Sequence, residues 1–359
     1  MNKFAVVLAG GGGTRFWPLS RKERPKQLLR LGSDDIMLND TIARFETVIP
    51  IQHTYVVTNQ SQAELLADMV RPGVPQENIL VEPVGRSTAA SILYAALTVD
   101  QTDPEAILAV FPADHYITDQ VQFVTTLELA FRAADSSPRL VTIGIRPVFA
   151  ATGYGYIRYQ ETPVYSEGGL VYAVEEFVEK PNLPTATGYL SSHHHLWNSG
   201  ILMGKVSVII ENFRRYLPRL YRLMSPLRQH LGTSAERSVV DAIYADLPSI
   251  SIDYGILERS DDVLVVIGDF DWNDVGTWEA LGTIFPPDAS GNIVQADHIG
   301  MGTQNSIIYS TDRLIATIGI DGLIIADTKD ALLICPKEQS QAVRALVDRL
   351  DAEGRHEFL

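Results

Sequence analysis

Apolar and polar positions along the first half of the chain form blocks that predict strands and helices in turn. The run FAVVLAG (4–10) is unbroken and apolar, which is typical of a strand buried on both faces. In MLNDTIARFETV (37–48), Leu38, Ile42 and Phe45 recur at spacings of four and three, which indicates one buried helical face. The alternation continues through TYVVTNQ, SQAELLADMV, STAASILYAALTV, AILAVFPADH, TTLELAFRAAD and LVTIGIRP. This order predicts an α/β fold with a Rossmann-like, mostly parallel sheet, in which ligands bind beyond the carboxyl ends of the strands.

The pattern changes at Thr152. Three strands, GYGYIRY, LVYAVEEFVEKP and GILMGKV, are separated by polar loops and by helices expected around 206–224 and 234–246. We therefore predict one large domain over 1–285, with an insertion at about 152–260 folded against the first sheet. Within the first half, Ser61 and Glu64 have the spacing of a capping box and predict a helix start.

Two consecutive prolines, Pro286 and Pro287, mark a boundary before a tail that covers 286–359. In this tail Ile308, Leu314, Ile320, Ala326 and Leu332 recur every six residues, and QSQAVRALVDRL follows as a terminal helix. A six-residue period is typical of a β-helix, although any series of short strands can also produce it. From the period alone the tail is thus either a small β-helix domain or another series of short strands, and it ends in a helix.

Composition narrows the possible partners and location. The chain has 359 residues with 46% hydrophobic positions, and 44 Asp and Glu against 29 Lys and Arg give a formal charge of -15. Such an acidic balance disfavours nucleic acid and anionic membrane surfaces as partners. The first residues lack a signal-peptide core and no run of about 18 apolar residues occurs, so we expect no membrane span and a cytoplasmic protein. The single cysteine, Cys335, excludes an intrachain disulfide.

Against this acidic background, the stretch 5–31 has four glycines and six Lys or Arg against one Glu. Glycines after a strand let backbone N–H groups approach a phosphate, and a following helix end adds a favourable dipole. The stretch fits neither a Walker loop nor a dinucleotide fingerprint, which leaves Arg15 and Lys26 as candidate phosphate ligands. A solvated basic loop is the alternative.

Two carboxylates follow predicted strands or lie in loops beside aromatic residues: Asp114 in FPADH and Asp274 in FDWNDVGTW. Such a pair can hold one Mg²⁺ that also binds phosphate oxygens, whereas a single Asp in such a position is more often a turn or helix cap. In FVEKP, Glu179 and Lys180 follow a strand, where adjacent side chains point in different directions. The carboxylate then suits sugar hydroxyls and the ammonium suits a phosphate.

Between residues 8 and about 280 the chain carries, in order, LAGGGGTRFWPLSR, PKQLL, EPVGRSTAAS, FPADH, TGYGYI, FVEKP, WNSGILM, SIDYGILE and WNDVGTW. Together these motifs resemble the sugar-phosphate nucleotidylyltransferases. The long spacer between Arg15 and Lys26, with WNSG and SIDY, is most similar to the branch that transfers guanylate to mannose 1-phosphate. The tail resembles the short β-helix of the same branch.

The resemblance implies that GTP and α-D-mannose 1-phosphate are the substrates, that GDP-mannose and pyrophosphate are the products, and that Mg²⁺ is the cofactor. It implies the following residue roles: nucleotide binding by Leu8, Ala9, Gly10, Gly11, Gly13, Thr14, Arg15, Glu82, Arg86, Ser87 and Thr88; catalysis by Arg15, Lys26, Asp114 and Asp274; metal binding by Asp114 and Asp274; sugar-phosphate binding by Gly155, Glu179, Lys180, Asn198 and Gly200. We also expect a homodimer.

One position departs from the branch: its turn near the base usually reads GRNTA, and here Ser87 replaces the asparagine. Selectivity for guanine is therefore the expectation that this departure affects most directly. Two alternatives stay open on the sequence. One is a nucleotidylyltransferase for another NTP or hexose 1-phosphate, and the other is a non-catalytic nucleotide-sugar sensor. Retention of Lys26, Asp114 and Asp274 favours an enzyme.

Overall fold

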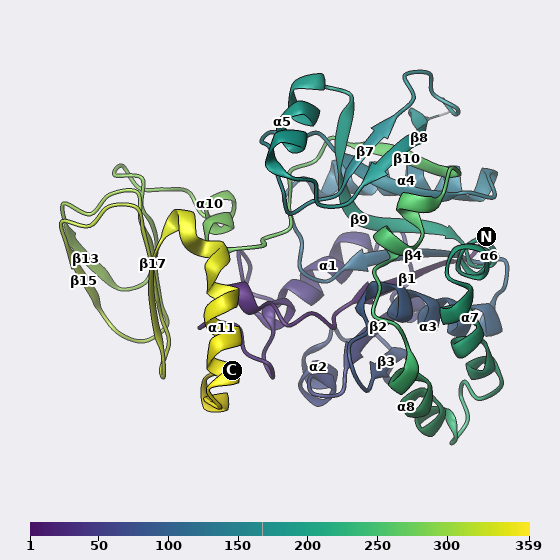
Figure 1. The fold of residues 1–359 in the computed structure, drawn as a ribbon, viewed down its shortest axis with the longest axis horizontal. Coiled ribbons are helices and arrows are strands. Elements are labelled where there is room, and N and C mark those ends of the chain that lie inside the picture. The colour runs from purple at the N-terminus through teal and green to yellow at the C-terminus, as the bar shows by residue number, and fades with distance from the viewer. Residues whose placement is uncertain (167) are drawn as a thin grey trace.

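A nine-stranded sheet forms the centre of the protein in the computed structural model, which describes residues 1–166 and 168–359 (Figure 1). Across the sheet the strands are ordered β3 (Ile79–Glu82), β2 (Thr54–Asn59), β1 (Lys3–Leu8), β4 (Ile107–Pro112), β9 (His195–Lys205), β6 (Leu140–Ile145), β10 (Val263–Gly268), β8 (Val171–Val178) and β7 (Tyr156–Tyr159). A second, two-stranded sheet pairs β5 (Tyr116–Ile117) with β11 (Trp272–Asn273).

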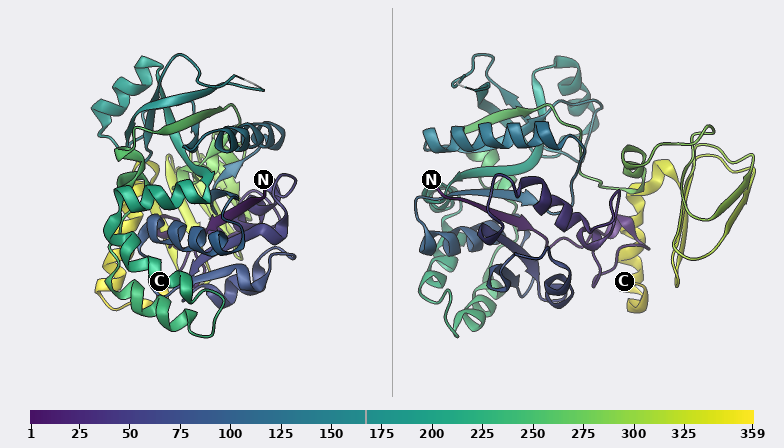
Figure 2. Two further views of the ribbon diagram at one scale, coloured as in Figure 1. Left: turned by 90° about the vertical axis from the view of Figure 1, so that its right-hand side faces the viewer. Right: turned by 180° about the vertical axis from the view of Figure 1, so that it is seen from behind.

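Helices cover both faces of the sheet because its central strands are apolar on both faces (Figure 2). In β1, Phe4 and Val6 join the core of one face, and Ala5 and Val7 join that of the other. The first face is covered by α3 (Ser87–Thr102), α6 (Val206–Tyr216), α7 (Pro218–Met224), α8 (Glu236–Asp246) and α9 (Ile252–Gly255). The second is covered by α1 (Met37–Phe45), α2 (Ala63–Met69) and α4 (Gln120–Ser136), and α5 (Leu183–Ser192) lies beside β9.

The sheet is mixed, which corrects the expectation of a mostly parallel one. Strands β3, β2, β1 and β4 pair in parallel, as do β6 and β10. Strand β9 runs antiparallel to both β4 and β6, and β8 runs antiparallel to β10 and β7. The first four strands are joined by helical connections long enough for parallel pairing, whereas β7 and β8 are joined directly as a hairpin.

The segment 152–260 does not fold against the sheet as a separate insertion, because three of its strands belong to the sheet. Strand β9 lies between β4 and β6 at the centre. Its Leu202 joins the core on one face and Met203 joins the core on the other. Burial on both faces therefore places this strand inside the sheet.

Two local helix expectations are also corrected. Helix α2 begins at Ala63, and the hydroxyl of Ser61 donates to the side chain of Asn59 (2.7 Å) instead of capping the helix with Glu64. The helix expected over 206–224 is divided between α6 and α7 at Pro218, which has no N–H to continue a helical ladder. In the described part of the chain, no helix is long and apolar enough to span a membrane.

The tail is a β-helix, as predicted, but its coil is longer than six residues. Its strands are β12 (Ile293–Gln295), β13 (His298–Met301), β14 (Ile307–Ser310), β15 (Ile315–Ile318), β16 (Leu323–Asp327) and β17 (Leu332–Pro336). Parallel pairs stack His298 on Ile315 and Ile307 on Ile324, seventeen residues apart in both cases. Leu314 and Leu332, members of the six-residue series, are exposed, so that series does not trace the interior.

A third apolar core joins this tail to the first domain. Trp278 is fully buried and packs against Phe16 at a ring-centroid distance of 5.3 Å, and its Nε1 donates to the carbonyl of Trp17 (3.1 Å). Ile307 of β14 and Val343 of α11 (Val343–Ala352) complete the same core. Helix α11 consequently lies between the β-helix and the catalytic domain (Figure 1).

This joint predicts a large effect of truncating Trp278. The variant Trp278→Ala should lower the free energy of unfolding by about 3–5 kcal/mol, because it removes a buried aromatic ring and leaves a cavity. Urea titration monitored by circular dichroism measures the change. The control variant Leu314→Ala, at an exposed tail position, should stay within about 0.5 kcal/mol. A loss for Trp278→Ala no larger than that of the control would contradict a stabilising joint.

Candidate active site

Two adjoining cavities open at the carboxyl ends of β1, β3 and β4. The first, of about 370 Å³, is lined by Leu8, Gly10, Gly11, Glu82, Gly85, Ser87, Thr88, Ser91, Ile92, Val110, Pro112, Asp114, Gly200, Leu202, Ile252 and Asp253. The second, of about 300 Å³, is lined by Gly13, Thr14, Arg15, Phe16, Lys26, Asp114, His115, Asp274, Gly276 and Arg344. Asp114 belongs to both linings and marks where the cavities meet. Their position at strand ends is where α/β sheets bind ligands.

The glycine loop after β1 is held from behind through its carbonyl groups. Gln27, a buried residue, donates from Nε2 to the carbonyls of Ala9 (2.6 Å) and Gly11 (3.1 Å). The hydroxyl of Ser20 donates to the carbonyl of Gly13 (2.7 Å). Because these carbonyls are engaged by the protein, the loop can present N–H groups to an anion.

Gly13 is the position in this loop that requires glycine. Its φ is +59°, and a Cβ there would lie 2.5 Å from Cβ of Lys26. The helix expected after the loop is only a single 3₁₀ turn, η1 (Thr14–Phe16). So short a turn has little dipole, which corrects the expected contribution of a helix end.

Lys26 links three segments of the chain. Its side chain is 4% exposed, and Nζ donates to Oδ2 of Asp114 (2.7 Å) and to the carbonyl of Asp274 (2.5 Å). Burial opposes ionisation of Asp114, but the Lys26 ammonium and the surrounding hydrogen bonds hold the pKa of this carboxyl below its usual value. The pair is therefore charged, and its two charges lie at the junction of the cavities.

The second carboxylate, Asp274, is oriented by its own loop. Its Oδ1 accepts from the hydroxyl of Tyr154 (2.8 Å) and from the amide of Gly276 (3.1 Å). Gly276 leaves no room for a side chain, because a Cβ there would lie 2.9 Å from Oδ2 of Asp274. Asp114 and Asp274 line the same cavity, which is the arrangement that a shared metal site requires.

His115 lies beside both carboxylates without becoming a cation. Burial lowers its pKa to about 4, against the opposing charges of Asp114 and Asp274. The ring Nδ1 accepts from Nε1 of Trp272 (3.2 Å). Neutral His115 thus adds no positive charge to the second cavity at neutral pH.

Glu82 terminates β3 at the far end of the first cavity and is 3% exposed. Its Oε1 accepts from the hydroxyls of Tyr244 (2.7 Å) and Ser91 (2.9 Å). Burial raises the pKa of this carboxyl to about 6, although the two hydroxyls act in the opposite direction. Oε2 lies on the side of Gly10, which lines the same cavity.

The turn before α3 places its three predicted residues differently. Ser87 and Thr88 line the first cavity. Arg86 does not, because its guanidinium donates to the carbonyls of Tyr244 and Ala245 (both 2.9 Å). Ser87 adopts a left-handed φ of +63°, a region that Asn tolerates better than Ser. The asparagine usual at this turn in the resembling branch therefore has a backbone reason.

Beyond Asp114, the predicted sugar residues Gly155, Glu179 and Asn198 converge. A Cβ on Gly155 would lie 2.5 Å from Oε2 of Glu179 and 3.3 Å from Cβ of Asn198. Gly200, which itself adopts a left-handed φ of +74°, lines the first cavity. The site residues of this half thus come from the loop before β7, the end of β8 and the middle of β9.

Glu179 and Lys180 do not point in different directions, which corrects the expectation from FVEKP. Strand β8 ends at Val178, and Lys180 adopts a left-handed φ of +49°. This turn brings the Lys180 ammonium onto the Glu179 carboxylate as an ion pair. Alternation of side chains holds only while the backbone stays extended.

Two further functional candidates lie inside motifs that the sequence analysis quoted, although neither residue was singled out there. Asp253, from SIDYGILE, lines the first cavity and accepts from Nδ2 of Asn198 (3.0 Å). Burial, with the nearby charge of Glu179, raises its pKa to about 6. Gln27, from PKQLL, orders the glycine loop. Their membership in these motifs was the available signal for both.

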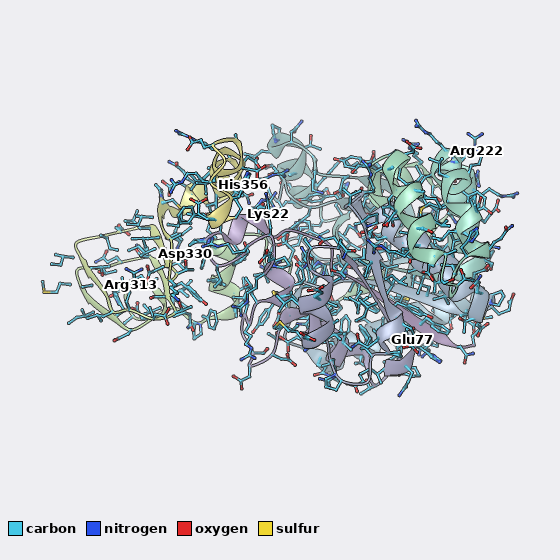
Figure 3. All side chains as sticks on the ribbon, turned by 90° about the horizontal axis from the view of Figure 1, so that it is seen from below. Lys22, Glu77, Arg222, Arg313, Asp330 and His356 are labelled. Carbon is cyan, nitrogen blue, oxygen red and sulfur yellow. The ribbon has the colours of Figure 1, made fainter. Side chains whose placement is uncertain are left out.

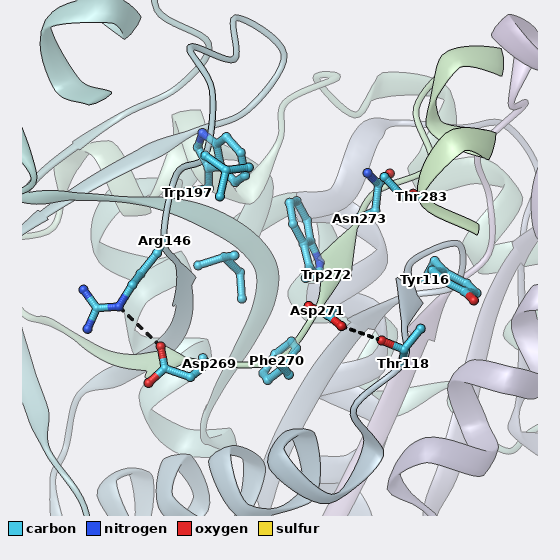
Figure 4. A pocket seen from close by; sticks show the side chains of 13 residues that line it. Tyr116, Thr118, Arg146, Trp197, Asp269, Phe270, Asp271, Trp272, Asn273 and Thr283 are labelled. Atoms are coloured by element: carbon cyan, nitrogen blue, oxygen red, sulfur yellow. Dashed lines mark hydrogen bonds and ion pairs between the residues drawn. The ribbon is translucent and has the colours of Figure 1, made fainter. Parts of the chain in front are cut away.

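Among the predicted residues, Ala9 also lies outside both cavities, since it is buried behind the loop. Four of the predicted sugar-phosphate residues line neither cavity: Gly155, Glu179, Lys180 and Asn198. A larger cavity, of about 540 Å³, is a separate hollow around Trp272 and Trp197 (Figure 4). Four of its polar side chains are paired with one another, Arg146 with Asp269 and Thr118 with Asp271. The two smaller cavities, which share Asp114, are therefore the candidate active site.

Comparison with known proteins identifies the family of the chain. The family model for nucleotidyl transferases matches residues 4–290, and one for the "MannoseP isomerase/GMP-like beta-helix domain" matches residues 296–350. The chain belongs to the nucleotidyl transferase family and is a nucleotidyltransferase enzyme, as the sequence motifs predicted.

Its relatives carry more particular names. The mannose-1-phosphate guanylyltransferase of Escherichia coli K12 is 37% identical over 358 residues, which cover 99% of this chain and 74% of that protein. The xanthan biosynthesis protein XanB of Xanthomonas campestris is 36% identical over 98% of this chain and 74% of its own length. A crystal structure from Thermus thermophilus, described as a mannose-1-phosphate geranyltransferase, has a TM-score of 0.86 and 34% identity, over 98% of this chain and 100% of that one.

Proposed function

We propose that this protein transfers GMP from GTP to α-D-mannose 1-phosphate, giving GDP-mannose and pyrophosphate. The observation that carries the proposal is the pair of cavities joined at Asp114: one ends at the buried Glu82 carboxylate, and the other contains Arg15 and Lys26. A base bound against Glu82 and a triphosphate bound against the cations would place the α-phosphate between them. The names of the relatives support the same substrates.

The nucleotide is recognised by acceptors at one end and donors at the other. Guanine N1–H and N2–H₂ donate to Oε2 of Glu82, whereas adenine has no N1–H to offer there. Leu8, Gly10, Gly11, Ser87 and Thr88 surround the nucleoside, and the loop at Gly13–Arg15 receives the triphosphate. These roles are assigned to residues that line the two cavities. Ala9 and Arg86 act behind them, by holding the loop and the turn.

The reaction is an in-line attack of the sugar phosphate oxygen on the α-phosphorus, with pyrophosphate leaving on the opposite side. Catalysis then consists of positioning and charge stabilisation. Arg15 steadies the leaving pyrophosphate. Lys26 supplies positive charge to the α-phosphate, for which its buried ammonium is already oriented by Asp114.

The donor set of the junction fits a divalent cation, which nucleotidyl transferases generally require, and we assign it to Mg²⁺. Lys26 engages Oδ2 of Asp114, while Tyr154 and the amide of Gly276 engage Oδ1 of Asp274. The second oxygen of each carboxylate is therefore available. Mg²⁺ prefers few protein carboxylates together with substrate oxygens and water, and it would neutralise phosphate charge there.

Mannose is recognised by groups whose orientation is set in advance. Oδ1 of Asn198 accepts from Thr142 (3.1 Å) and from the amide of Gly200 (3.2 Å), and Nδ2 donates to Asp253. One N–H of Asn198 therefore remains for a sugar hydroxyl, and Oε2 of Glu179 accepts from another. Gly155 leaves space for the ring, and Lys180 leaves its ion pair with Glu179 to bind the sugar phosphate.

A second copy of the chain is the partner we assign to the outer sheet of the β-helix. Ile299 and Met301 of β13 and Ile318 of β15 are all exposed there, and Ile318 is 72% exposed. An exposed apolar face of this kind is typical of an interface. The solution mass from light scattering should correspond to a dimer, and a monomer would reject this assignment.

The proposed function is tested by product identification. The protein is incubated with GTP, ATP, UTP and dTTP together with mannose 1-phosphate and glucose 1-phosphate, and nucleotide sugars are separated by mass. GDP-mannose should dominate, with kcat/KM for mannose 1-phosphate at least about tenfold above that for glucose 1-phosphate, since a misplaced hydroxyl leaves polar groups unpaired. A preference for UTP or dTTP with glucose 1-phosphate would move the protein to another branch, and absence of product would favour a sensor.

Replacing either junction carboxylate should slow the reaction without unfolding the protein. Asp114→Asn and Asp274→Asn should each lower kcat by roughly a hundredfold or more, because a metal ion contributes several kcal/mol of transition-state stabilisation. Asp269→Asn is the matched control, since Asp269 is exposed and lines the separate aromatic cavity. Near-full activity of a folded Asp114 or Asp274 variant, with unchanged magnesium dependence, would refute the metal assignment.

The raised pKa of Glu82 predicts pH-dependent base selection. Below about pH 6 the carboxyl is protonated and loses the negative charge that strengthens its hydrogen bonds to guanine, so the ratio of kcat/KM for GTP to that for ATP should fall as pH decreases through 6. Titration of a group that both nucleotides contact equally, such as Asp253, changes both kcat/KM values alike and leaves their ratio unchanged. Glu82→Gln should lower the ratio by about tenfold or more at pH 8, since hydrogen bonds to a charged group contribute about 1.5–3 kcal/mol. In this variant the ratio should no longer change near pH 6. If the change near pH 6 persists in Glu82→Gln, Glu82 is not the group that selects the base.

A further inference from the structure

The second cavity has one wall that does not come from the nucleotidyl transferase domain. Arg344, on the first turn of α11, lines it together with Gly13, Arg15 and Lys26. Gln341, three residues earlier, lines an adjoining hollow with Arg15 and Gly276. The C-terminal helix therefore reaches the region assigned to the triphosphate.

Helix α11 is anchored where it meets this region. Val343 and Val347 are buried in the core that contains Phe16 and Trp278. The neighbouring hydroxyl of Ser340 donates to the Glu279 carboxylate (3.1 Å). Since the residue before Arg344 is buried, the starting point of the Arg344 side chain is fixed relative to the loop.

Polar contacts also connect the basic loop near Trp17 to the end of α11 and the segment that follows it. Nε1 of Trp17 donates to the carbonyl of Phe358 (2.7 Å), and Lys22 forms an ion pair with Asp351 (2.7 Å). Figure 3 shows Lys22 beside His356 of the terminal segment. The basic loop that follows the glycines is thus packed directly against the end of the chain.

Arg344 determines the sign of the net charge in the second cavity. Lys26 is already bound to Asp114. Without Arg344, the two side-chain cations Arg15 and Lys26 are balanced by the carboxylates of Asp114 and Asp274. With Arg344 the lining carries a net positive charge, in a protein whose formal charge is -15.

Arg344 also differs from its neighbours in having no protein partner. Arg349, on the same helix, donates to Glu353 (2.7 Å), and Arg313 of the tail pairs with Asp327 (2.9 Å). Within residues 1–166 and 168–359, no hydrogen bond or ion pair engages the side chain of Arg344. A guanidinium left unpaired at the rim of an anion cavity is available for a phosphate oxygen.

We propose that Arg344 binds the β- and γ-phosphates of the nucleotide and the pyrophosphate formed from them, so that the C-terminal tail completes the active site. This inference rests on the proposed function for the identity of the anion. As the bond from the sugar phosphate oxygen to the α-phosphorus forms, the bond between the α-phosphorus and the bridging oxygen breaks. Its electron pair leaves with pyrophosphate, and Arg344 together with Arg15 offsets the added charge.

The test compares Arg344→Gln and Arg344→Lys with the control Arg349→Gln in the full-length chain. In the reverse reaction, Arg344→Gln should raise the KM for inorganic pyrophosphate by about tenfold or more, while the KM for GDP-mannose stays within about twofold. Arg344→Lys should recover part of the loss by charge alone, and Arg349→Gln should match the wild type. An unchanged pyrophosphate KM in Arg344→Gln, or an equal rise for both substrates with a lowered Tm, would overturn the proposal.

Direct binding separates this inference from the proposed function. Calorimetric titration with inorganic pyrophosphate in magnesium buffer should show weaker binding to Arg344→Gln than to the wild type, with a smaller difference for inorganic phosphate. If binding depends on Arg344 but no GDP-mannose is formed by the wild type, the proposed substrates fail and the anion site stands. If GDP-mannose is formed and pyrophosphate binding does not depend on Arg344, the inference fails alone.

Discussion

The buried ammonium of Lys26 is the contact on which the arrangement of the catalytic half depends. It connects the N-terminal basic loop to Asp114 after β4 and to the carbonyl of Asp274 after β11. Leaving a buried charge unpaired costs about 3–5 kcal/mol, so each of these segments is constrained by the other two. Gly13 lies against the same lysine, with no room for a Cβ. The glycine loop, the Asp114 carboxylate and the backbone at Asp274 are therefore held by one side chain.

The C-terminal tail supports this arrangement from the opposite side. Its core includes Phe16 and Trp278, which flank the loop and the Asp274 segment, respectively. Trp17 connects the two by accepting from Trp278 through its carbonyl and donating from its indole to Phe358. The tail is thus a structural partner of the loop as well as the source of Arg344. A change in its packing would alter the cavity without touching any residue of the sheet.

Burial acts on the titratable groups of the site in opposite directions, according to the charge each group would carry. It raises the pKa values of Glu82 and Asp253 to about 6, and it lowers that of His115 to about 4. In each case the neutral form is favoured because a low-dielectric environment disfavours the charged one. Asp114 is the exception, since Lys26 supplies the opposite charge at 2.7 Å. Charge is thereby concentrated at the junction of the two cavities.

The sequence by itself determined the early strands and helices, the β-helix tail, the glycine loop, and most residues that line the cavities. These features can be predicted from short stretches of sequence, because an apolar run indicates the local backbone conformation and a motif indicates the chemistry of its side chains. Tertiary structure alone decided that β9 enters the centre of the sheet, that Lys180 turns onto Glu179, and that Arg344 reaches the loop. Each depends on which distant segment packs alongside, or on a single left-handed residue. Periodicity specifies which face of an element is buried, but the partner that buries it is selected by packing across the whole fold.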